Sequence, residues 1–248
     1  MATLRVYLFG GLRVYHGEAP LPPFPTQKTR SLFAYLVTFR ERDHPRDLLA
    51  GTFWGDVPTA QARRSLNTTL WRLRRTLPAG YLRIQGNTVG FERASDCWID
   101  VLEFETALEE ARLPFFGEPG QSRLAESSAR LLDQAVELYR GDFLEGFGEE
   151  WCLVEAERLR SLYLQALAGL VGHHRAGAAY ETALGYAKRL LAADPLREDA
   201  HQQAMALYGL LGRRSEALDQ FEECRRLLQK ELDSAPLPET VALYERLR

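Results

Sequence analysis

The chain has 248 residues, of which 46% are hydrophobic and 26% charged, a composition typical of an ordinary soluble globular protein of one to three domains. Its net charge of -3 hides a division, because residues 1–95 hold 14 Lys and Arg against 6 Asp and Glu, whereas residues 96–248 hold 17 against 28. The basic first part favours a nucleic-acid partner, and the acidic second part argues against one there.

The chain begins with two short segments rich in β-branched and aromatic residues, at 3–9 and 12–16. The Gly10-Gly11 pair separates them, which predicts a β-hairpin. A proline-rich connection follows at 19–25.

Apolar residues at helical spacing then predict a helix over 27–39, with Lys28 and Arg30 in its first turn. Cations at a helix N-terminus oppose the helix dipole, so a nearby DNA phosphate would explain them. A second short helix is predicted over 46–54, and the segment GDVP at 55–58 separates it from the next one.

The central prediction is one amphipathic helix over 59–77, with Thr59 available to cap its start and Pro78 to end it. One face is apolar. The opposite face and its shoulders carry five arginines with polar and aromatic residues, namely Arg63, Arg64, Asn67, Thr68, Trp71, Arg72, Arg74 and Arg75.

No acidic residue lies within this segment, so its arginines repel each other unless an outside anion neutralises them. Arginine can bind guanine edges or phosphate, Asn can pair with adenine, and a Thr methyl can contact thymine. We therefore expect the helix to lie in the major groove of DNA. The alternative is that the face is simply solvated.

Two strands at 81–85 and 88–92, around Gly86 and Asn87, predict a second hairpin. Strands, three helices with a basic third, and a hairpin form the order of a winged helix. The hairpin offers Arg83, Gln85, Asn87 and Thr88 to phosphates or the minor groove. For any one of these residues, a structural role at a sheet edge is an equal alternative.

From residue 99 onward the pattern is helical throughout, with helices predicted at 100–113, 124–139 and about 151–174. In the remainder, the Ala-Leu pair at 183–184 recurs 34 residues later at 217–218. Tyr208, Ala217 and Phe221 fall where a tetratricopeptide repeat (TPR) places aromatic, small and aromatic residues. The predicted fold class is mainly α with a small β component, a winged helix-turn-helix followed by an all-α, TPR-like domain.

No enzymatic chemistry is indicated, since the sequence lacks GxSxG, HExxH and Gly-rich phosphate loops. We expect no catalytic residue, no metal and no cofactor. We interpret His173-His174 as a helix-end pair near terminal carbonyls, and Cys224 as a small core residue. Three widely spaced cysteines and the lack of a long apolar segment predict a cytoplasmic protein with no membrane contact.

An ordered set of long motifs resembles one known family. They are LRVYLFGGLRV at 4–14, QKTRSLFAYL at 27–36, ARRSLNTTLWRLRRTL at 62–77, YRGDFLEGF at 139–147, the segment at 194–232 and PLPETVALYERL at 236–247. The resemblance is to Streptomyces antibiotic regulatory protein (SARP) type activators, which join an OmpR-like winged helix to a bacterial transcriptional activator domain (BTAD).

The resemblance implies a winged-helix domain over 1–96 and a BTAD over 97–248. It implies binding to promoter repeats on double-stranded DNA, often by adjacent copies, with recruitment of RNA polymerase. The polymerase would contact the loop formed by Gly55, Asp56, Val57 and Pro58.

Two functional classes follow from these patterns. The first is a promoter-binding activator whose helical part serves self-association on DNA, a ligand or a partner protein. The second is a helical-repeat adaptor whose winged helix makes protein contacts.

Overall fold

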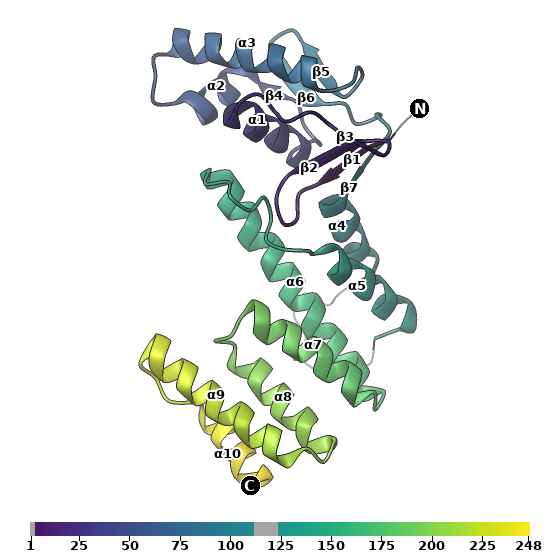
Figure 1. The fold of residues 1–248 in the computed structure, drawn as a ribbon, viewed down its shortest axis with the longest axis vertical. Helices are drawn as coiled ribbons and strands as arrows, with labels where there is room; N and C mark the ends of the chain where they lie inside the picture. The colour runs from purple at the N-terminus through teal and green to yellow at the C-terminus, as the bar shows by residue number, and fades with distance from the viewer. Residues whose placement is uncertain (1–2, 112–123) are drawn as a thin grey trace. The chain divides into compact units, whose positions relative to one another are not determined.

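The computed structural model describes residues 3–111 and 124–248. The chain folds into two compact units (Figure 1). The first contains Met1–Val101 together with Gly141–Leu153, and we call it the winged-helix unit. The second contains Leu102–Arg140 and Val154–Arg248, and we call it the helical unit.

The winged-helix unit opens with a four-stranded sheet in the order β3-β2-β1-β7. Its strands are β1 (Leu4–Tyr7), β2 (Arg13–His16), β3 (Ala19–Pro20) and β7 (Cys97–Ile99). The predicted first hairpin is confirmed, since β1 and β2 are antiparallel with Val6 opposite Val14. The sequence did not predict β3 or β7, and β7 runs parallel to β1.

Three helices and a second hairpin complete the winged-helix order. The helices are α1 (Gln27–Thr38), α2 (Arg46–Trp54) and α3 (Thr59–Thr76), within one residue of their predicted ends. The hairpin strands β5 (Leu82–Gln85) and β6 (Thr88–Phe91) are antiparallel, and β4 (His44–Pro45) adds to β6. The predicted order of elements is confirmed.

Helices α1 and α3 begin differently. The Thr26 hydroxyl caps α1 by accepting a hydrogen bond of 3.2 Å from the Thr29 N–H. The predicted capping of α3 by Thr59 is wrong, because Pro58 occupies the cap position and no side chain bonds there. Pro58 has φ -55°, and Thr59 already lies in the first helical turn.

A segment from later in the chain completes the core of the winged-helix unit. Phe143 forms a β-bridge with Phe9, and the Leu144 N–H donates to the Leu8 carbonyl at 2.7 Å. The Trp151 ring packs edge-on against Tyr35, with centroids 5.2 Å apart. Segment 141–153 is therefore part of the core of this unit.

The helical unit contains α5, α7, α8, α9 and α10 and, beyond their first residues, α4 and α6 (Figure 1). Their bounds are α4 (Asp100–Ala111), α5 (Glu126–Leu138), α6 (Glu150–Ala176), α7 (Tyr180–Ala193), α8 (Glu198–Leu210), α9 (Arg214–Leu232) and α10 (Pro238–Leu247). The predicted helices at 100–113, 124–139 and 151–174 are confirmed where they fall in the described residues; residues 112 and 113 lie outside them.

The repeat positions inferred from the sequence form the core between α7, α8 and α9. Ala183 and Ala217 are fully buried, and both belong to a cluster that includes Leu184, Leu207 and Tyr208. Small residues let successive helices approach closely, so each helix pair covers the apolar face of the next. The TPR-like architecture is confirmed.

Candidate nucleic-acid interface

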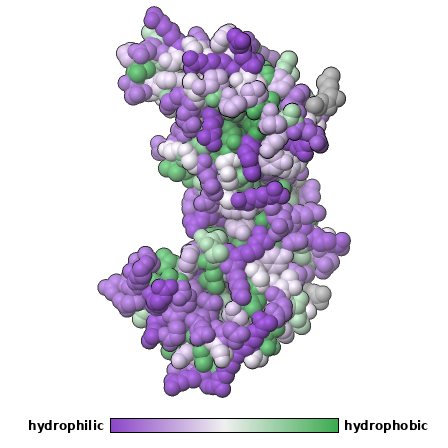
Figure 2. Space-filling view, viewed as in Figure 1, coloured by the Kyte–Doolittle hydropathy of each residue, from purple (hydrophilic) through white to green (hydrophobic). Residues whose placement is uncertain are grey.

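Helix α3 has the two faces that its sequence predicted. Ala62, Leu66, Leu70 and Leu73 are no more than 4% exposed and face the core of the winged-helix unit. The opposite face is open to solvent and carries Arg63, Arg64, Asn67, Thr68, Trp71, Arg74 and Arg75, with Arg72 partly exposed. In the space-filling view, the edge of the molecule formed by α3 is mostly hydrophilic (Figure 2).

Trp71 is the one large apolar residue on this polar face and is 57% exposed. The Arg75 guanidinium lies over its ring, 4.9 Å from the centroid, which is a cation–π contact. An exposed indole beside an arginine offers both a flat apolar surface and a charge. Bases or sugars beside phosphates have the matching chemistry.

One of the five arginines is already neutralised within the protein. Arg63 makes a bidentate pair with Asp47 of α2, at 2.7 and 2.9 Å, and this pairing lowers the pKa of Asp47. The expectation that every arginine of α3 lacks a carboxylate is wrong for Arg63, because packing brings α2 alongside. No carboxylate of the described residues pairs with the other four, Arg64, Arg72, Arg74 and Arg75.

A groove of about 360 Å³ runs between the start of α1, the end of α2 and the outer face of α3. Its walls include Lys28, Trp54, Gln61, Arg64, Thr68 and Arg72. Three of these side chains are cations, so the groove suits an anion such as a backbone phosphate. Sequence reasoning missed Gln61 and Trp54 here; Gln61 could have been found, since it lies three and seven residues before Arg64 and Thr68 on one helical face.

The two cations in the first turn of α1 have different surroundings. Lys28 is exposed and lines the groove. The Arg30 guanidinium instead lies over the Phe147 ring, 4.4 Å from its centroid, and Arg30 is not part of the groove lining. Lys28 is therefore the better placed of the two to meet a phosphate.

The wing supplies polar residues at its tip. Gln85 and Asn87 are exposed beside Gly86, which has the positive φ of 55° that the turn requires. The Thr88 hydroxyl donates to the Gln85 carbonyl at 3.0 Å. Arg83, farther down β5, is occupied internally, since its guanidinium bonds Asp43 at 2.7 Å and lies 3.6 Å from Glu92.

The loop between α2 and α3 is open to solvent. Gly55, Asp56 and Pro58 are exposed and Val57 is partly exposed. The Val57 N–H donates to the Trp54 carbonyl at 3.3 Å, which holds the loop close to the end of α2. The loop thus presents one carboxylate and one apolar side chain for a protein partner.

The surroundings of Cys224 and of the His173-His174 pair bear on their interpretation as structural residues. Cys224 is fully buried in the helical unit, and burial raises its pKa to about 11. His173 and His174 lie in the last turn of α6, as the helix-end interpretation expected. Their rings contact side chains, since the His173 Nε2 lies 3.7 Å from the Glu126 carboxylate and the His174 ring stacks on Tyr186. Among the described residues, no group of three or more His, Cys, Asp or Glu is arranged to hold a metal, and no helix is long and apolar enough to cross a membrane.

Comparisons with known proteins agree with this architecture. Residues 99–248 match the family model "Bacterial transcriptional activator domain". The chain is 28% identical over 249 residues to the regulatory protein AfsR of Streptomyces coelicolor, covering 99% of this chain and 24% of AfsR. It is also 28% identical to the regulatory protein DnrI of Streptomyces peucetius, with 94% of this chain and 88% of DnrI covered.

A further relative at 28% identity is the transcriptional regulatory protein MoaR1 of Mycobacterium tuberculosis, with 91% of this chain and 73% of MoaR1 covered. Among solved structures, Mycobacterium tuberculosis EmbR in complex with a low affinity phosphopeptide superimposes with a TM-score of 0.75 at 23% identity. That match covers all of this chain and 65% of EmbR, and it shows the shared fold.

The fold defines a class: a winged helix with an arginine-rich third helix, joined to TPR-like helical repeats. Within that class, the chain belongs to the bacterial transcriptional activator domain family and to the SARP type of regulators in it. It spans about a quarter of the length of the AfsR proteins that it matches.

Proposed function

We propose that this chain is a sequence-specific DNA-binding transcriptional regulator that acts in the cytoplasm as an activator and recruits RNA polymerase to promoters. The observation that carries the proposal is the outer face of α3, where four arginines without a carboxylate partner among the described residues surround Asn67, Thr68 and Trp71. The relatives AfsR, DnrI and MoaR1 are regulatory proteins by name, which supports the same function.

In this proposal α3 lies in the major groove, and its exposed side chains divide into two roles. Arg64 and Asn67 lie in the N-terminal half of the helix, the part of a recognition helix that contacts base edges, and Thr68 follows at its middle. Lys28, at the groove beside α3, contacts the phosphate backbone. The tip of the wing, with Gln85 and Asn87, contacts the backbone or the minor groove alongside.

The test compares a base-reading variant with a phosphate-binding variant. Asn67→Ala should lose discrimination at one or two base pairs, by about 1–3 kcal/mol, while its affinity for random duplex changes little. Lys28→Ala should weaken binding to all sequences alike. Selection from a random duplex pool, followed by competition titrations, measures both; equal losses on specific and random duplexes for Asn67→Ala would contradict its role.

Salt dependence separates this function from that of a helical-repeat adaptor. Binding to DNA should weaken with a log–log slope of about -0.9 for each phosphate that the protein neutralises. An adaptor whose winged helix contacts only proteins would enrich no duplex over background. The whole proposal fails if no duplex is enriched at low salt by a folded full chain.

Recruitment of polymerase and assembly of adjacent copies are the remaining parts of the proposal. We propose that RNA polymerase contacts the exposed α2–α3 loop, Gly55 to Pro58. We also propose that copies of the chain associate on DNA through the helical unit. Asp56→Ala should lower transcription in a reconstituted assay without lowering affinity for the promoter, because the loop lies outside the DNA-reading face. A parallel loss of promoter affinity would place Asp56 in DNA binding instead.

A further inference from the structure

Trp71 is the largest exposed side chain of α3, and the base and phosphate contacts proposed above do not involve it. It is the one exposed tryptophan among the chain's four, all of which lie in the described residues. With the Arg75 guanidinium already over its ring, 4.9 Å from the centroid, the residue is still 57% exposed. A molecule that covered the indole would remove its apolar surface from water, which is favourable.

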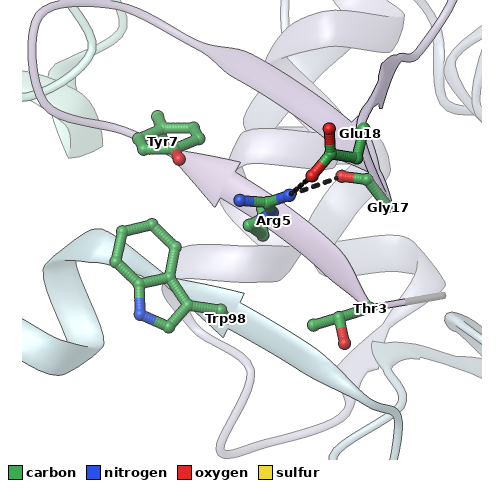
Figure 3. Close-up of a pocket in the computed structure, with 6 residues that line it drawn as sticks. All are labelled: Thr3, Arg5, Tyr7, Gly17, Glu18 and Trp98. Atoms are coloured by element: carbon green, nitrogen blue, oxygen red, sulfur yellow. Dashed lines mark hydrogen bonds and ion pairs between the residues drawn. The ribbon is translucent and has the colours of Figure 1, made fainter.

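The surroundings of Trp71 differ from those of Trp98 on the four-stranded sheet. The Trp98 ring is partly buried and packs against Tyr7, with centroids 5.1 Å apart. The guanidinium of Arg5 beside them lies 3.9 Å from the Glu18 carboxylate (Figure 3). That cluster finds its partners within the chain, whereas no aromatic ring among the described residues packs on Trp71. Trp71 is therefore the tryptophan available to another molecule.

The position of Trp71 around α3 directs it at base edges rather than at phosphates. At about 100° per residue, Trp71 falls within about 20° of Arg64, on the line opposite the buried Leu73. Arg72 and Arg74 lie about 80° to either side of that line. When a helix docks in the major groove with its buried side away from the DNA, its central line faces the base edges and its shoulders face the phosphates.

Thymine is the base whose edge matches Trp71 and its neighbour. Its C5 methyl is the apolar group that the bases present in the major groove, and its O4 acceptor lies beside that methyl. The indole of Trp71 offers an apolar surface, and the Arg75 guanidinium beside it offers N–H donors to O4. Cytosine has an amino donor in place of O4 and no methyl group, so it matches neither side chain.

We propose that Trp71 is a specificity-determining residue that reads a thymine through its methyl group, with Arg75 holding the indole in place. This inference rests on the proposed function, because it requires α3 to lie in the major groove. In zinc fingers, side chains three or four residues apart on the helix contact successive bases. Trp71 lies seven residues after Arg64, so the thymine should lie about two base pairs from the base that Arg64 contacts.

The test takes the duplex enriched by the selection and replaces its thymines, one at a time, with deoxyuridine, which lacks only the methyl group. At one thymine, binding to the unaltered full chain should weaken about fourfold, which corresponds to about 0.8 kcal/mol and to the burial of one carbon. Trp71→Ala should bind the thymine and uracil duplexes equally. Anisotropy titrations of labelled duplexes measure these affinities.

Leu48→Ala is the matched control for Trp71→Ala. It truncates another large apolar side chain, 49% exposed, which lies on α2 instead of α3. This variant should keep the fourfold preference of the unaltered chain for thymine over uracil. Circular dichroism checks that both variants are folded, and both side chains are exposed enough for truncation to leave the core intact.

Three results would each overturn the proposal. The first is that no uracil weakens binding to the unaltered chain. The second is a uracil effect that persists in Trp71→Ala; its loss in Thr68→Ser would then assign the methyl contact to Thr68. The third is an equal loss of affinity for thymine and uracil duplexes in Trp71→Ala, which would make Trp71 a backbone contact. All three leave the enrichment of a duplex, and hence the proposed function, unaffected.

Discussion

The carboxylate of Asp100 organises the end of β1. It accepts hydrogen bonds from the backbone N–H groups of Leu8, Phe9 and Val101, at 2.8 to 3.1 Å, and is 2% exposed. Burial raises its pKa to about 6, while the three donors act in the opposite direction. Asp100 is thus a structural carboxylate within the winged-helix unit, with no part in DNA contact.

Asp100→Asn should therefore destabilise the winged-helix unit at neutral pH. An amide has a single accepting oxygen, so its NH₂ group would face the N–H of Phe9 or Val101 and leave a buried donor unsatisfied. The expected loss is about 1–3 kcal/mol in the free energy of unfolding, measured by urea denaturation. Asp96→Asn, an acidic residue nearer the surface, is the control; equal losses in both would contradict the assignment.

His44 gives the winged-helix unit a pH-dependent stability. Its ring is 1% exposed among Tyr35 and Phe39, and its Nε2 lies 3.1 Å from the Phe39 carbonyl. Burial is the largest effect on its pKa and lowers it, so the folded state binds a proton less readily than the unfolded state. The contribution of His44 is present above the ordinary pKa of about 6.5 and is lost as the pH falls below it.

The unfolding free energy should accordingly fall between pH 7.5 and pH 5.5, and less so in His44→Phe. Phenylalanine keeps an aromatic ring among Tyr35 and Phe39 but cannot take up a proton. Comparing the two proteins isolates His44 from other histidines, such as His174, whose pKa burial also lowers. Parallel pH profiles in the two proteins would contradict this prediction.

At the scale of elements, the amphipathic pattern of α3 was readable from its sequence because every buried position recurs with the helical period. The same is true of α7 and α9, whereas every residue of α1 from Ser31 to Val37 is buried, so its apolar spacing predicted a helix but not which face is buried. The sequence could not show that Asp47 neutralises Arg63, because that pair depends on how α2 packs against α3. It likewise could not show that Arg83 is held by Asp43, since these residues meet only when β4 joins the wing.

The ion pair between Asp47 of α2 and Arg63 of α3 should limit how many phosphates α3 can neutralise. Asp47→Asn frees the Arg63 guanidinium, so the log–log salt slope of DNA binding should steepen by about 0.9, with tighter binding at low salt. Glu41→Gln is the matched control, because it removes one exposed carboxylate from an ion pair with Arg40, away from α3. If both variants change the slope equally, general charge rather than release of Arg63 is the cause.

At the scale of the whole chain, two features of the winged-helix unit had no signal in the sequence. Strand β7 is three residues long and forms only by pairing in parallel with β1, some ninety residues earlier in the chain. The return of segment 141–153 to this unit also depends on long-range contacts, while the change from basic to acidic composition near residue 96 carries no information about it. Local periodicity in a sequence predicts helices and hairpins. Pairings between distant segments have no local pattern and are seen only in the structure.

Because segment 141–153 packs in the winged-helix unit, a mutation in this late segment should destabilise the first elements of the chain. Phe143 is 2% exposed and bridges Phe9, so Phe143→Ala should cost about 3–5 kcal/mol and increase hydrogen exchange in β1 and α1. Phe221→Ala truncates an equally large buried side chain, 6% exposed in α9 of the helical unit. It should speed exchange in α8 and α9 and leave β1 protected. Faster exchange in α8 and α9 but not in β1 for Phe143→Ala would show that 141–153 belongs energetically to the helical unit.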